Sequence, residues 1–174
     1  RPSSTAETCK TAAAAANGGT ETGSSALRAG RTGLLQEHVY LAGITTGEAL
    51  AGHDFKPAAA ALEANTQGLQ DAVASVYGDA GGKQFGDLWR KHIGFFVNYT
   101  LGKATKNAAM TAKAVSDLDG YRTGFGQLIN SVVPELPADA VANELKPPVA
   151  SLFTAIADVV GGSPKPFVDI PPAA

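Results

Sequence analysis

Two histidines in matching apolar surroundings are the residues of this chain best suited to chemistry. His38 lies in "LLQEHV" and His92 in "LWRKHI", each within a helical pattern of apolar residues. Neutral imidazole binds copper and zinc. The pair therefore predicts either a copper or zinc site, or a small-ligand site. The alternative is two core histidines whose ring nitrogens hydrogen-bond to backbone carbonyls or to Thr or Tyr on a facing helix. In that alternative the protein has no cofactor.

Carboxylate ligands are poorly placed to help the histidines. Helical metal sites use ligand pairs three or four residues apart, because such pairs project toward one point. Glu37 adjoins His38 and points about 100° away from it, and Asp87 precedes His92 by five residues. A third ligand would come from elsewhere. The aromatic residues expected around the site, as ligand contacts or core, are Trp89, Phe95, Phe96, Tyr99 and Tyr121.

Catalytic patterns are missing from the sequence. The lone cysteine, Cys9, lies near the N-terminus, and neither G-x-S-x-G nor H-E-x-x-H occurs. No glycine-rich phosphate loop follows a strand. We therefore predict that the protein is not an enzyme. His53 in "AGHDFKP" is expected in an exposed loop, and Asn98 in "NYT" is a candidate for N-glycosylation.

Composition fits one globular domain and excludes several partners. The 174 residues are 44% hydrophobic and 17% charged, with a net charge of −2 and no basic run. This balance argues against nucleic acid and anionic membrane surfaces as partners. No apolar stretch reaches the roughly 20 residues that a membrane span needs. The chain starts at Arg1 rather than Met, which predicts removal of an N-terminal piece such as a secretory signal, and hence export.

Both ends of the chain differ in composition from the middle. Residues 1–30 are rich in Ala, Ser, Thr and Gly, which predicts a low-complexity arm. Cys9 in this arm could form an intermolecular disulfide or remain an unpaired thiol. Residues 163–174 form a proline-rich tail with Phe167, Val168 and Ile170 as contact residues. These tails predict a protein partner, and self-association is one form that it could take.

Residues 31–162 are expected to form an all-α, up-and-down bundle of four long helices plus a fifth. The ranges are 34–52, 54–78, 87–106, 108–133 and 137–160. Asp54 and Asn107 are expected N-caps and Gly78 an expected helix stop. The fourth helix has an apolar stripe of Val115, Leu118, Tyr121, Phe125 and Leu128. The fifth helix is expected to start at Pro137 and to kink at Pro147 and Pro148.

The first two helix pairs read as copies of one hairpin. Leu34 and His38 align with Leu88 and His92 at an offset of 54 (92 − 38), and Leu62 aligns with Leu118 at an offset of 56 (118 − 62). In the fifth helix Val149 takes the place of the histidine. Gly120 and Gly124, one turn apart in the fourth helix, predict close helix packing or a ligand cleft.

The "EHV" and "LW-x-x-H-[IV]" helices, each followed by an amphipathic helix, resemble an uncharacterised family of secreted bacterial helical-bundle proteins. The resemblance covers residues 33 to about 160. It implies an up-and-down bundle and an exported location, and it implies no activity. Taken together, the sequence predicts a non-catalytic, secreted structural or interaction protein that assembles through its tails. The alternative is a metal-binding or small-ligand-binding bundle that uses His38 and His92.

Overall fold

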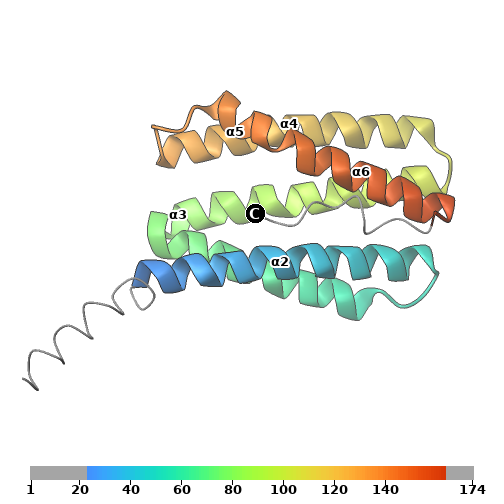
Figure 1. Cartoon of the computed structure of the whole chain (residues 1–174), viewed down its shortest axis with the longest axis horizontal. Coiled ribbons are helices and arrows are strands. Elements are labelled where there is room, and N and C mark those ends of the chain that lie inside the picture. The colour runs from blue at the N-terminus through green and yellow to red at the C-terminus, as the bar shows by residue number, and fades with distance from the viewer. Residues whose placement is uncertain (1–22, 164–174) are drawn as a thin grey trace, which may run out of the picture.

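The computed structural model describes residues 23–163, with side chains from residue 29 onward, and this part is built from helices and short turns (Figure 1). The helices are α2 (Gly23–Leu50), α3 (Lys56–Ala104), α4 (Ala108–Val132), α5 (Ala138–Glu144) and α6 (Lys146–Gly161). No strand occurs between residues 23 and 163. The predicted all-α class is confirmed for this part of the chain.

Helix α3 bends back on itself at Gly78. The backbone there has φ 78° and ψ 168°, which lies outside the helical region. Glycine adopts a positive φ without the steric cost that a Cβ brings. The two halves of α3 therefore run side by side in opposite directions (Figure 1). They approach closely, because a Cβ added to Gly82 would lie 2.6 Å from the Cβ of Ala74. Residues 79–86, expected as a loop, are helical instead.

One of the two predicted N-caps is observed, and the starts of α2 and α3 differ from the prediction. Asn107 is the N-cap of α4, since its side chain accepts a hydrogen bond of 3.0 Å from the Met110 amide. Phe55, rather than Asp54, occupies the N-cap position of α3, although the Asp54 carboxylate accepts a 3.1 Å hydrogen bond from the Lys56 amide. Helix α2 begins at Gly23, within the expected N-terminal arm. Extending an existing helix costs less than starting one, so the small residues of "GSSALRAG" can join the helix that follows them.

The expected fifth helix is two helices. Pro137 is the N-cap of α5, which ends at Glu144, and α6 starts at Lys146 with prolines in its first turn. A proline inside a helix removes a backbone hydrogen bond, whereas a proline in the first turn removes none. The chain therefore restarts a helix at this point instead of kinking one.

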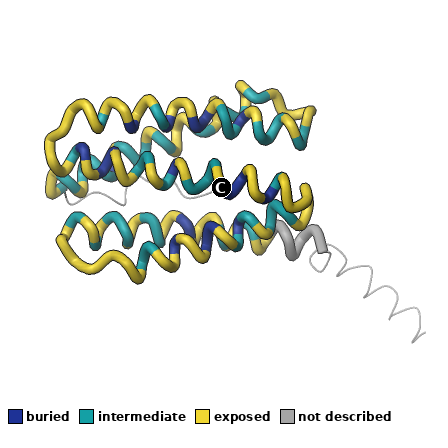
Figure 2. The backbone as a smooth tube through the Cα atoms, turned by 180° about the vertical axis from the view of Figure 1, so that it is seen from behind, coloured by how far each residue is buried: buried dark blue, intermediate teal, exposed yellow. Residues whose placement is uncertain are grey.

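The long helices lie side by side, and α3 packs against both α2 and α4 (Figure 1). Helix α5 packs on α4, and α6 packs along α3. Buried turns recur on the facing sides of the helices, and exposed turns lie on the outside (Figure 2). The buried apolar residues are Leu62, Leu69, Phe85, Tyr99, Ala114, Leu118, Tyr121 and Ala155. Val115, expected on the apolar stripe of α4, is instead exposed, because the neighbouring Ala114 occupies the buried side of the helix at this level.

Gly126 lies at a close approach between α4 and α5. A Cβ at this position would overlap the carbonyl oxygen of Ala138 in α5. Gly120 meets nothing within 4 Å, and Gly124 has only an ordinary contact of 3.7 Å with Leu88. The expected close approach therefore occurs at Gly126, two residues after Gly124 and six residues after Gly120. Between residues 23 and 163, no helix is both long enough and apolar enough to be a membrane span.

Candidate functional site

His38 and His92 come together in the interior of the bundle. His38 lies on α2 and His92 on the second half of α3, and their relative exposures are 9% and 8%. Their ring centres are 5.5 Å apart, with an angle of 46° between the ring planes. The fold thus places two residues that are 54 positions apart in sequence (92 − 38) side by side.

Aromatic rings hold both imidazoles in place. Trp89 contacts both edge to face, with ring centres 4.9 Å from His38 and 4.5 Å from His92. Tyr121 of α4 stacks on His92 at 4.9 Å with an interplanar angle of 28°. Phe96 meets His92 at 6.2 Å. Three of the aromatic residues expected around the site therefore contact a histidine.

The ring contacts extend along the core beyond the histidines. Phe85 stacks on Trp89 at 5.1 Å, and Phe153 of α6 stacks on Tyr99 at 4.3 Å. Phe85 and Phe153 were not among the aromatic residues predicted at the site, although Phe85 lies one helical turn before Trp89. Phe95 is half-buried and stands outside this series of ring contacts.

Four buried side-chain atoms in the described part of the chain have no protein hydrogen-bond partner. They are Nδ1 of His38, Oδ1 of Asn65, Nε1 of Trp89 and Nδ1 of His92. Buried polar atoms nearly always have a partner, so each exception calls for a cause. All four belong to neighbouring side chains: Trp89 contacts both histidines, and Asn65 is close enough to His38 to affect its pKa. The exceptions thus form one polar centre inside an aromatic shell.

Asn65 is a member of this centre that the sequence analysis missed. Its amide Nδ2 donates to the Leu34 carbonyl at 2.9 Å and to Oε2 of Glu37 at 2.7 Å. These two acceptors fix the orientation of the amide, and the Asn65 side chain also interacts with His38 and raises the pKa of that histidine. The signal was present in the sequence, because Asn65 lies three residues after Leu62 and four before Leu69, on the buried side of the helix.

Burial keeps both histidines neutral. Desolvation lowers the pKa of His38 to about 4, and the Asn65 side chain opposes part of this effect. Desolvation, together with the nearby His38, lowers the pKa of His92 to about 3, and the backbone of Trp89 opposes it. Desolvation also raises the pKa of Tyr121 above its usual range. At neutral pH the centre therefore contains uncharged imidazoles and an uncharged phenol.

The remaining candidate residues lie away from this centre. Asn98 is exposed on α3. His53 is exposed as expected, and its Nδ1 lies 2.9 Å from Oε2 of Glu48. Cys9 and the tail residues Phe167, Val168 and Ile170 fall outside the described residues, so their predicted contacts stay predictions.

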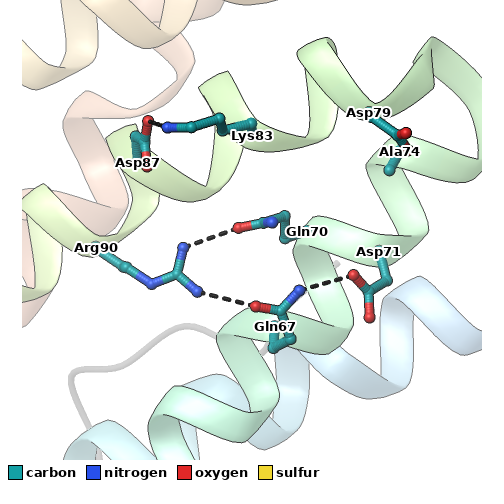
Figure 3. Close-up of a pocket in the computed structure, with 8 residues that line it drawn as sticks. All are labelled: Gln67, Gln70, Asp71, Ala74, Asp79, Lys83, Asp87 and Arg90. Carbon is teal, nitrogen blue, oxygen red and sulfur yellow. Dashed lines mark hydrogen bonds and ion pairs between the residues drawn. The ribbon is translucent and has the colours of Figure 1, made fainter.

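An open polar groove lies between the two halves of α3, and it includes neither histidine (Figure 3). Its side chains already pair with one another. Arg90 donates to Oε1 of Gln70 at 2.8 Å, and Lys83 pairs with Asp87 at 2.6 Å. Gln67 donates to Asp71 at 2.8 Å. We assign this groove a structural role in holding the halves of α3 together.

Within residues 23–163, no group of three or more His, Cys, Asp and Glu side chains is arranged to hold a metal ion. Any ion at the centre described above would therefore depend on the two imidazoles. Comparison with known proteins found no matching family model, no matching curated protein and no matching solved structure.

Proposed function

We propose that this protein is a non-catalytic binding bundle that holds a copper or zinc ion between His38 and His92. The observation that carries the proposal is the pair of buried Nδ1 atoms, one on each ring, that have no protein partner. With metal–nitrogen bonds of about 2.0 Å, the centre of each imidazole lies roughly 3 Å from a bound ion. One ion bound by both rings requires ring centres no more than about 6 Å apart, and the two centres are 5.5 Å apart.

The protonation state supports the same function. A histidine must be neutral to bind a metal, and protons compete with the ion wherever the ring is charged. The depressed pKa values, about 4 for His38 and about 3 for His92, keep both nitrogens available throughout the neutral range. The cost of burying two neutral rings is far smaller than that of burying two charged ones.

Asn65 lies beside His38 and is held in turn by Glu37. Glu37 accepts from the Asn65 amide, and the Asn65 side chain interacts with His38. Hydrogen-bonded residues of this kind orient metal-binding imidazoles in proteins. Asn65 would hold the ring of His38 in position, and its oxygen is available as a weak additional ligand.

The centre also fits a duplicated helix hairpin. Asn65 corresponds to Tyr121 at the offset of 56 (121 − 65) that relates Leu62 to Leu118. Asn65 lies close to His38 and Tyr121 stacks on His92, so each histidine meets the same position of the following helix. A duplication that brings two copies of one residue together explains how a paired site arises.

A structural or interaction role is the second candidate, supported by apolar residues on the outer face of α2. Tyr40 is 74% exposed and Ile44 is 52% exposed, one turn further along the helix. Exposed apolar groups that cluster mark contact surfaces. In this role the exported protein would associate with a protein partner, including a copy of itself, with the tails contributing to the contact.

Metal uptake tests the first proposal. The purified protein is loaded with copper or zinc, passed through a desalting column and subjected to elemental analysis. We expect one equivalent of metal per chain, lost in both His38→Ala and His92→Ala and kept in His53→Ala, the matched control at the exposed histidine. If none of these proteins retains metal, or if all of them retain it equally, the proposal is wrong.

A further inference from the structure

The ligand set at the histidine centre restricts the charge of the ion. The metal-binding form of an imidazole is uncharged, and the neighbouring rings are apolar: Trp89 contacts both histidines, and Tyr121 and Phe96 contact His92. The carboxylate linked to the centre is Glu37, which is itself exposed and is separated from His38 by Asn65. A divalent ion would keep nearly its full charge in this apolar shell, and the cost of burying an ion rises steeply with its charge.

The number of ligands points in the same direction. Zinc in proteins is almost always four-coordinate, and Cu(II) prefers a tetragonal set of nitrogen and oxygen ligands. Two imidazoles and one amide oxygen satisfy neither preference. Cu(I) has a closed d shell and forms stable complexes with only two nitrogen donors, so the pair of histidines is sufficient for it.

We propose that the ion is Cu(I), bound between His38 and His92 and covered by the indole of Trp89. This inference rests on the proposed metal-binding function and specifies the ion. The indole centre lies within 5 Å of both imidazole centres, at 4.9 Å and 4.5 Å. An ion held between the two imidazoles would therefore lie near the indole, and a cation over the face of an indole is attracted by the ring quadrupole more strongly than over other aromatic side chains.

Aromatic neighbours restrict the movement of the Trp89 indole, which would lie over the bound ion. Phe85 stacks on the indole at 5.1 Å, and Phe125 of α4 lies 6.5 Å from it. The indole therefore cannot swing away from the histidines without disturbing the core. Both histidines are themselves buried, and a buried site protects bound Cu(I) from oxygen and from exchange with the solvent.

The sequence provides a specific optical probe, because Trp89 is the only tryptophan. Its fluorescence therefore reports on this centre alone. The protein would be titrated without oxygen, in a Cys9→Ser background that removes the only thiol, with Cu(I), with Ag(I) as a redox-inert monovalent ion, and with Zn(II). We expect Cu(I) and Ag(I) to change the fluorescence up to one equivalent, and Zn(II) to bind at least tenfold more weakly.

A graded substitution tests the role of the indole. Affinity is measured by competition with a coloured Cu(I) chelator, since the variants lack the fluorescence signal. Trp89→Leu should bind Cu(I) about tenfold more weakly and Trp89→Phe should be intermediate, in the order of cation–π strength. Thermal melting shows that each variant is folded, and Phe125→Leu is the control for lost aromatic packing near the indole.

The outcomes separate this inference from the function on which it rests. If Zn(II) binds through His38 and His92 more tightly than Cu(I), the ion is misassigned and the metal-binding function stands. If no ion binds through these histidines, both are wrong. If the folded Trp89→Phe variant binds Cu(I) as tightly as the parent protein, the indole does not cover the ion and that part of the inference fails.

Discussion

Acidification from pH 7 to pH 5 should destabilise the metal-free protein through His38 and His92. Burial lowers their pKa values to about 4 and about 3, whereas a histidine in an unfolded chain titrates near 6.5. Between these values the unfolded chain binds protons that the folded protein does not bind. The free energy of unfolding is therefore highest above about pH 6.5 and falls as the pH decreases toward the folded-state pKa values.

The size of the effect follows from the pKa differences. At pH 5 each histidine is almost fully protonated in the unfolded chain and almost fully neutral in the folded protein. The loss is 2.303RT multiplied by 1.5 pH units, or about 2 kcal/mol per histidine. The two residues together give about 4 kcal/mol, which is a large part of the roughly 5–15 kcal/mol that stabilises a typical domain.

Urea denaturation at pH 7, 6 and 5 measures this linkage. The parent protein is compared with the His38→Gln/His92→Gln double variant, because glutamine is polar and does not titrate. Carboxylates titrate equally in both proteins, so the difference between their pH dependences isolates the two histidines. Each single variant should remove about half of the difference.

Equal pH dependence in the parent protein and the double variant would refute the reasoning. That result would mean that His38 and His92 gain protons in the folded protein as readily as in the unfolded chain. The centre would then be accessible to water, and the neutral, desolvated pair on which the metal proposal depends would not exist.

Two further predictions concern packing and assembly. Gly126→Ala should destabilise the protein by about 1–3 kcal/mol, because the new Cβ overlaps the Ala138 carbonyl of α5, whereas Gly120→Ala, with nothing within 4 Å, should stabilise it by up to about 1 kcal/mol. Thermal melting of the two variants checks this contrast, and equal melting temperatures would contradict it. Deletion of residues 163–174 should convert a self-associated protein to a monomer with an unchanged melting temperature, because proline-rich strips lose little entropy when they bind to another chain. Native mass spectrometry that shows the same number of associated chains before and after the deletion would exclude assembly through this tail.

Local sequence features determined the helical class and several helix ends. The spacing of apolar residues identified helices, since a helix needs one continuous apolar face to pack. Asn107 caps α4 as expected, and Gly78 breaks α3 as expected, because both effects depend on the backbone of a few adjacent residues. The sequence also indicated His38 and His92 as a pair, since they occur in matching surroundings.

Tertiary structure alone decided what surrounds that pair. Asn65, Phe85 and Phe153 join the centre or the aromatic series beyond it because of how the helices meet. The close approach of α5 to Gly126 likewise depends on the position of a short helix whose sequence carries no mark of its partner. Periodicity shows which side of a helix is apolar, but it does not show which residue of a distant helix faces that side. The chemistry of the histidine centre arises from such contacts: they exclude water from the rings, hold them neutral and leave their nitrogens without a protein partner.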